Sequence, residues 1–168
     1  RVESSLFPLL GVEPVKGRGF LASEDVPGRP AKVALISNDL WVSRFEEDPD
    51  VIGRSLWLDN EVHEVIGVMK PGFEFPEWAK VWVPLGLEPS VHPRESHRFD
   101  IVGRLADGVS IEQARREMQT VTGELEALYP ETNRGWGVRI LPSREKWAPP
   151  VIRLALTASL GAALFVKL

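Results

Sequence analysis

The chain has 168 residues, of which 43% are hydrophobic, and it carries a formal net charge of −4. This length fits one ordinary domain or two small lobes, and the apolar content is enough to build a core. The negative charge argues against a nucleic-acid-binding surface, and no block of lysine and arginine is present to attract an anionic membrane. The chain contains no cysteine, which excludes disulfides, thiolate catalysis and cysteine-bound metal.

Two helices and a buried strand are predicted near the start of the chain. Residues 4–10 predict a short helix that Gly11 can end, because glycine tolerates the left-handed backbone at a helix C-terminus. An irregular stretch with several prolines and glycines follows. The apolar run 32–36 predicts a buried strand, and Ser37 can then cap a second helix that reaches to about Phe45.

The middle of the chain predicts mainly strands. Residues 54–58 and 62–69 read as a hairpin across a turn at residues 59–61, and residues 81–83 predict another short strand. His63 lies on the second strand of the hairpin, where we expect an exposed cross-strand position rather than a catalytic base. A core role is expected for the tryptophans on regular elements, which are Trp41, Trp57 and Trp82.

The clearest local pattern lies in the last third. After a polar loop over residues 88–96, alternating apolar residues predict a half-buried strand over residues 98–105. Ser110 and Gln113 form a capping-box pattern at the start of a long helix with a single apolar stripe. Residues 136–140 alternate again, so this region predicts a βαβ unit.

The tail of the chain differs in kind from the rest. Residues 154–166 carry no charge, and a helix formed by them would be apolar all round, with small residues that suit close packing in a bilayer. A membrane span needs about 20 residues. We therefore interpret residues 151–168 as the first turns of a membrane helix, although Lys167 does not fit this interpretation. A buried terminal helix is the alternative.

Residues that could carry chemistry do not form a recognisable set. His92, Glu95 and His97 are close in sequence, but their spacing matches no helical pair of metal ligands, so a solvated loop is favoured over a metal site. The acidic run after the second predicted helix lacks the spacing of a calcium loop and is interpreted as a solvated turn; it comprises Glu46, Glu47, Asp48 and Asp50. No nucleophile–base set or phosphate-binding loop is recognisable. The sequence thus predicts no catalytic, cofactor-binding or metal-binding residue.

Four segments, taken together and in this order, resemble a known family. They are VESSLFPLLG (residues 2–11), the stretch from VALISNDLW to GFEFP (33–76), GRLADGVSIEQARREM (103–118) and LYPETNRGWGVRILPSRE (128–145). The family is the MacB-like periplasmic core domain, found in bacterial permeases with FtsX-like membrane segments. Each segment alone is only moderately specific for this family, whereas the order and spacing of all four segments are a strong indication of it.

The resemblance implies an α+β fold of two lobes. Residues 1–150 would form the periplasmic core domain, in which a mainly-β lobe of residues 21–90, approximately, is inserted into a βαβ-containing lobe. The family's domain lies between two membrane helices, so residues 151–168 would begin the second of these, and any first membrane helix would lie upstream of Arg1.

The resemblance also implies a role in transport. The chain would be the periplasmic part of an ABC transporter permease in the bacterial inner membrane, with no catalysis and no cofactor. Its implied partners are a cytoplasmic ABC ATPase, a second permease copy in a dimer, and a periplasmic protein. Motion of the membrane helices, driven by the ATPase, would change the contacts that the domain makes with substrate or partner.

Two other interpretations remain beside the permease domain. One is a freestanding periplasmic binding domain whose C-terminal helix packs on its own core. The other is a metal-dependent enzyme that would use His92 and His97.

Overall fold

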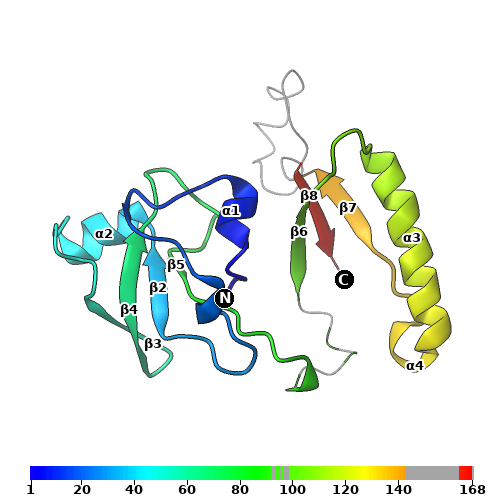
Figure 1. The fold of residues 1–168 in the computed structure, drawn as a ribbon, viewed down its shortest axis with the longest axis horizontal. Coiled ribbons are helices and arrows are strands. Elements are labelled where there is room, and N and C mark those ends of the chain that lie inside the picture. Colours follow the sequence, from blue (N-terminus) through cyan, green and yellow to red (C-terminus); the bar gives the residue numbers. More distant parts are fainter. Residues whose placement is uncertain (92–93, 95, 97–98, 143–162, 168) are drawn as a thin grey trace. The chain divides into compact units, whose positions relative to one another are not determined.

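The computed structural model describes residues 1–91, 94, 96, 99–142 and 163–167. The chain divides into two compact units, Arg1–Val91 and His92–Leu168, called unit 1 and unit 2 below (Figure 1). Both units combine helices with a separate β-sheet. The predicted α+β class is therefore confirmed.

Unit 1 is built on a five-stranded mixed sheet. Four strands pair in the order β1, β4, β2, β5, and the fifth strand, β3, also pairs with β4. Strands β2 and β4 are parallel, and the other pairs are antiparallel. The strands are β1 (Lys16–Gly17), β2 (Val33–Ile36), β3 (Ser55–Leu58), β4 (Glu61–Val68) and β5 (Val81–Trp82).

Short helices connect these strands. The helical elements are α1 (Leu6–Leu10), α2 (Asn38–Phe45), and the 3₁₀ turns η1 (Ala22–Glu24) and η2 (Pro89–Val91). Ser37 caps α2, since its hydroxyl oxygen accepts a hydrogen bond from the amide of Leu40 at 3.1 Å. Gly11 ends α1 in the left-handed conformation, with φ of 65°. Both predicted helices are confirmed, and α1 begins two residues later than expected.

The sheet of unit 1 buries apolar side chains on both faces. One cluster contains Phe7, Phe20, Val33, Leu35, Ile66, Met69, Ala79 and Trp82. A second cluster contains Ala34, Ile36, Val51, Leu56, Val65 and Val68. The pairing between β2 and β4 shifts register after Ala34, so Val65 and Val68 can both face the second cluster. A sheet covered on both faces explains why every residue of β2 is buried.

The hairpin of β3 and β4 corrects two predictions. Its turn, Asp59–Asn60, has positive φ at both residues, as a type I′ hairpin turn requires. His63 was expected at the surface but is 4% exposed, because it pairs with Leu56 on the face that covers the second cluster. Trp57 was expected in the core but is 71% exposed, because it pairs with Val62 on the opposite face. The core role is confirmed for Trp82, and Trp41 packs against the second cluster.

Unit 2 contains a three-stranded sheet and two helices. In chain order the elements are β6 (Asp100–Arg104), α3 (Ile111–Leu128), α4 (Pro130–Asn133), β7 (Arg139–Pro142) and β8 (Ala163–Lys167). Strand β8 lies between β6 and β7 and is antiparallel to both, so β6 and β7 run parallel to each other. The predicted βαβ arrangement is thus confirmed, with one additional strand between its two strands. Pro130 ends α3 as predicted, but it also begins α4.

The structure differs from the prediction of a membrane helix at the end of the chain. Ala163–Lys167 form strand β8, whose backbone pairs with the facing edges of both β6 and β7. Leucine, phenylalanine and valine are common in buried strands. Hydrogen bonds to two neighbouring strands also favour the extended form of this segment. The rest of the predicted segment, 151–162 and 168, lies outside the described residues. Within the described part of the chain, no helix combines the length and apolar character needed to cross a membrane.

The predicted periplasmic core domain of residues 1–150, with an inserted lobe of about residues 21–90, stays a prediction. In the structure the chain divides after Val91, and residues 1–20 belong to unit 1 together with the residues that follow them. The reason is packing, since Phe7 and Phe20 lie in the first apolar cluster and β1 pairs with β4.

Candidate functional site

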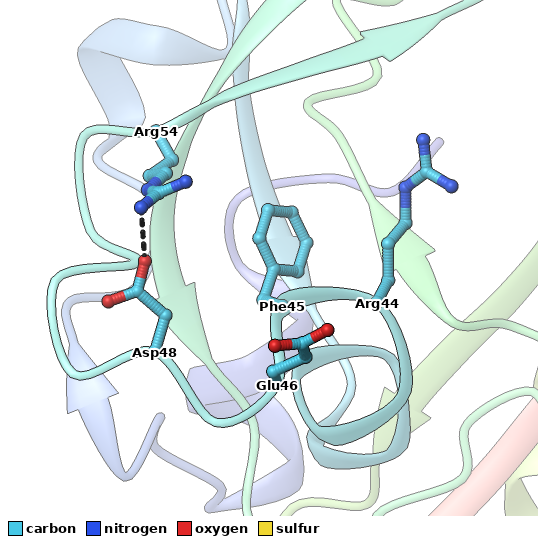
Figure 2. A pocket seen from close by; sticks show the side chains of 5 residues that line it. All are labelled: Arg44, Phe45, Glu46, Asp48 and Arg54. Atoms are coloured by element: carbon cyan, nitrogen blue, oxygen red, sulfur yellow. Dashed lines mark ion pairs between the residues drawn. The ribbon is translucent and has the colours of Figure 1, made fainter.

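A hollow of about 380 Å³ lies at the C-terminal end of α2. It is lined by Arg44, Phe45, Glu46, Asp48 and Arg54, and its walls are mainly polar (Figure 2). The lining comes from the last turn of α2 and from the turn that leads to β3. The acidic run singled out in the sequence therefore contributes two residues to this hollow, Glu46 and Asp48.

Asp48 organises the turn beside the hollow. One carboxylate oxygen accepts a hydrogen bond from the amide of Asp50 at 2.9 Å, and the backbone oxygen of Asp48 accepts one from Trp41 Nε1 at 2.9 Å. The other oxygen, Oδ2, lies 2.6 Å from Arg54 Nη2. Oδ2 is buried and has no partner with hydrogen-bond geometry, so this contact is an ion pair rather than a well-directed hydrogen bond.

The hollow offers charges of both signs. Figure 2 shows the Asp48–Arg54 ion pair on one side and Arg44 extending away from it. Glu46 and Glu47 are held in the left-handed conformation, with φ of 51° and 57°. These side chains can attract ions, but they do not bring a nucleophile and a base together.

The remaining candidate ligands from the sequence fall in two groups. His92, Glu95 and His97 lie outside the described residues, so the predicted choice between loop and metal site stays a prediction. Glu46, Glu47 and Asp50 are exposed, as expected for a solvated turn. No group of three or more histidine, aspartate or glutamate side chains positioned to hold a metal ion occurs within the part of the chain that the structure describes.

Besides Asp48 and Arg54, three further ion pairs lie on the surface of unit 1. Glu24 accepts two hydrogen bonds from the Arg18 guanidinium, at 2.6 and 2.9 Å, and this contact lowers the pKa of the Glu24 carboxyl. Asp39 accepts a hydrogen bond from Lys80 at 2.8 Å, which raises the pKa of that amine. The third pair, Lys32 with Glu61, lies beside the hairpin and lowers the pKa of the Glu61 carboxyl.

The segments through which the chain enters and leaves unit 1 meet at one place. The amide of Val2 donates to the oxygen of Val83 at 3.0 Å, in a parallel bridge between Val2 and Pro84. Next to this bridge, the two carboxylate oxygens of Asp25 accept hydrogen bonds from the amides of Ser4 and Gly86, at 2.7 and 2.6 Å. Sequence reasoning missed Asp25, which stands in an irregular stretch with no pattern that singles it out.

In unit 2 the long helix α3 keeps much of its apolar stripe accessible. Leu128 is 70% exposed and Val121 is 42% exposed. The guanidinium of Arg115 ties α3 to β7 by donating two hydrogen bonds to the oxygen of Ile140, at 3.1 and 3.3 Å. At the end of α3, the guanidinium of Arg94 lies over the Tyr129 ring, 3.7 Å from its centroid.

A likeness to solved structures first defines the class of fold. The chain is similar to the crystal structure of the periplasmic region of MacB from Actinobacillus actinomycetemcomitans, with a TM-score of 0.52 and 14% sequence identity. The similarity covers 78% of this chain and 56% of that one, so this chain spans little more than half of the MacB periplasmic region. At this identity the likeness shows a shared fold alone.

The family follows from the sequence itself. The model of the MacB-like periplasmic core domain matches residues 1–121. The chain therefore belongs to the family of MacB-like periplasmic core domains, and the resemblance noted in the sequence is confirmed. No curated protein sequence matches the chain significantly.

Proposed function

We propose that this chain is the periplasmic domain of an ABC transporter permease in the bacterial inner membrane. The observation that carries this proposal is the family match over residues 1–121, supported by the fold shared with the periplasmic region of MacB. In this role the domain passes the motion of membrane helices to substrate or partner contacts and performs no reaction. Stiff elements and an interaction surface suit such work better than a catalytic pocket.

The partners proposed for this role follow from the same family membership. They are a cytoplasmic ABC ATPase, reached through the membrane part of the permease, a second permease copy, and a periplasmic protein. The apolar stripe of α3 and the exposed side chain of Trp57 are accessible surfaces of the kind that protein contacts use.

Location can be tested with single cysteines, because the natural chain has none. Asp50→Cys in unit 1 and Asp107→Cys in unit 2 place a thiol at exposed positions, whereas Ala34→Cys buries one as a matched control. The variants are produced in the protein's own host, and intact spheroplasts are prepared from these cells. We expect a membrane-impermeant maleimide to label the two exposed thiols in the spheroplasts. The buried thiol should react only after denaturation. Labelling of the exposed thiols only after lysis would overturn the periplasmic location.

A second candidate function is a freestanding periplasmic binding domain. The observation that favours it is β8, which makes Ala163–Lys167 part of the sheet of unit 2. Extraction of membranes with alkaline carbonate separates the two candidates. A permease domain stays with the membrane and needs detergent for release, whereas a freestanding domain is recovered in the soluble fraction.

A further inference from the structure

The two ends of unit 1 are held together by contacts between residues far apart in the sequence. Val2 and Pro84 form a parallel bridge, so the entering and leaving segments run side by side in the same direction. The hydrogen bond from Val2 to Val83 supports this bridge at 3.0 Å. Segments so arranged can be separated only by sliding past each other or by peeling apart.

Asp25 joins both segments through one carboxylate. Its Oδ2 accepts from the amide of Ser4 at 2.7 Å, and its Oδ1 accepts from the amide of Gly86 at 2.6 Å. Both distances are short for hydrogen bonds from amide nitrogen, as is usual when the acceptor is charged. The half-buried Asp25 follows η1, a turn in which Glu24 accepts hydrogen bonds from Arg18. The carboxylate is therefore anchored to a third segment of unit 1.

The backbone conformation of Gly86, in the leaving segment, allows its amide to reach Asp25. This residue has φ of 56°, a left-handed conformation that favours glycine. A Cβ atom here would lie 2.5 Å from Pro30 Cδ, so a side chain does not fit. The oxygen of Gly86 also accepts a hydrogen bond from the amide of Gly28 at 3.0 Å. The contact is thus made by both polar backbone atoms of Gly86.

We propose that Asp25 is a positioning residue that couples the entering segment of unit 1 to the segment leading to unit 2, so that the two move as one. This inference rests on the proposed function, in which motion reaches the domain along the chain from the membrane. A pull on Arg1 then passes through Ser4 and Asp25 to Gly86 without deforming the apolar core.

The parallel arrangement determines how these contacts carry load. When residue 1 and residue 91 are pulled in opposite directions, the force runs along both segments. The bridge at Val2 and the two hydrogen bonds of Asp25 are then strained together rather than one after another. Such a shear arrangement resists force better than a hairpin opened from its end, where bonds break singly.

Amide hydrogen exchange in the full chain tests the coupling directly. Asp25→Ala removes both acceptors, and Asp25→Asn keeps one oxygen acceptor but loses the other. We expect exchange at Ser4 and Gly86 to accelerate by about tenfold in Asp25→Ala, the effect of losing one net hydrogen bond. The observed exchange rates of core amides such as Leu35 should change far less. Asp50→Ala, which removes an exposed carboxylate elsewhere in unit 1, is the matched control.

A purely structural role for Asp25 predicts a different exchange pattern. Loss of Asp25 would then accelerate exchange at Leu35 by the same factor as at Ser4 and Gly86, through the global unfolding equilibrium. That outcome, or unchanged exchange at both amides, would overturn the coupling.

Force measurements test the mechanical consequence. Handles attached through Arg1→Cys and Val91→Cys pull on the two ends of unit 1, and the chain offers no other thiol. We expect Asp25→Ala to shorten the lifetime of unit 1 under constant force by about tenfold. Asp50→Ala should leave that lifetime unchanged. Equal lifetimes for all three proteins would exclude a load-bearing role.

These measurements are independent of the proposed function. Exchange and force report on the coupling whether or not the chain belongs to a transporter. Cysteine labelling in spheroplasts reports on the periplasmic location whether or not Asp25 couples the two segments. Failure of one proposal is therefore recognisable while the other stands.

Discussion

At the scale of single residues, the turn after α2 stores backbone strain. Glu46 and Glu47 both have positive φ, at 51° and 57°. The left-handed conformation costs a residue with a side chain roughly 1–2 kcal/mol, and glycine avoids this cost. Both carboxylates are exposed, and neither forms an ion pair with a described residue that would offset the strain.

We expect Glu46→Gly to stabilise unit 1. The expected gain is about 1 kcal/mol, because relief of the left-handed strain exceeds the greater chain entropy that glycine gives the unfolded state. Urea unfolding of the full chain measures the change. Glu117→Gly, inside helix α3, is the matched control and should destabilise unit 2 by about 1 kcal/mol, since glycine disfavours a helix interior. Destabilisation by both substitutions would contradict the strain at Glu46.

Glu24 should make the stability of unit 1 depend on pH. Its pKa is lowered from the usual 4.5 by the hydrogen bonds from Arg18, so the folded state binds a proton less readily than the unfolded state. The stabilisation is therefore complete above the unfolded pKa and is lost as the pH falls through the lower folded value.

We expect Glu24→Gln to reduce stability at neutral pH by roughly 0.5 kcal/mol, the size expected for a half-exposed ion pair. Near pH 2 the variant and the natural chain should differ less, because protonation of Glu24 removes the charge that pairs with Arg18. Urea unfolding followed by tryptophan fluorescence at both pH values provides the comparison. A loss that is the same at both pH values would mean that Glu24 acts through packing rather than charge.

At the scale of elements, local signals located most of the helices and strands but did not determine which face of a strand is buried. Ser37 and Ser110 each accept the capping hydrogen bond that their sequence patterns predict, because a cap involves neighbours only three residues away. The hairpin was also predicted, but His63 and Trp57 were assigned to the wrong faces. Alternation gives the period of a strand, whereas the buried face depends on the elements that pack against it.

Contacts between distant segments were beyond prediction from one sequence. Strand β8 exists through pairing with β6 and β7, and its apolar residues suit a strand as well as a helix. Asp25 is separated from Gly86 by 61 residues. Nothing in an aspartate flanked by loop residues indicates such a partner.

Burial predicts different effects for two tryptophans, the exposed Trp57 on β3 and the buried Trp82 on β5. Trp57→Ala should change the free energy of unfolding by no more than about 0.5 kcal/mol, because the side chain is exposed. Trp82→Ala should cost about 3–5 kcal/mol, because it removes a buried ring that packs edge-on against Phe7. Chemical denaturation of each variant measures the difference. A large loss on removing Trp57 would mean that its face is covered by another part of the protein.

At the scale of the whole molecule, unit 1 has two clusters of buried apolar side chains, one on each face of its sheet. Within residues 99–142 of unit 2, the buried hydrophobic side chain is Ile140, and no residue of α3 is fully buried. Burial of apolar surface is the main force for folding, so we expect α3 to belong to a less stable part of the chain than the sheet of unit 1.

This difference predicts that unit 2 unfolds before unit 1. Exchange of backbone amides with deuterium should be faster in α3 than in β2 and β4, where the sheet is covered on both faces. Ile140→Ala should destabilise unit 2 by about 2–5 kcal/mol, the cost of emptying a core position. Because Ile140 also accepts the hydrogen bonds of Arg115 through its backbone, that tie between β7 and α3 survives the substitution. The loss would then come from packing alone, and β2 should keep its protection. If protection falls equally in both units, they unfold as one cooperative body, and a movement started at one end would be felt throughout the domain.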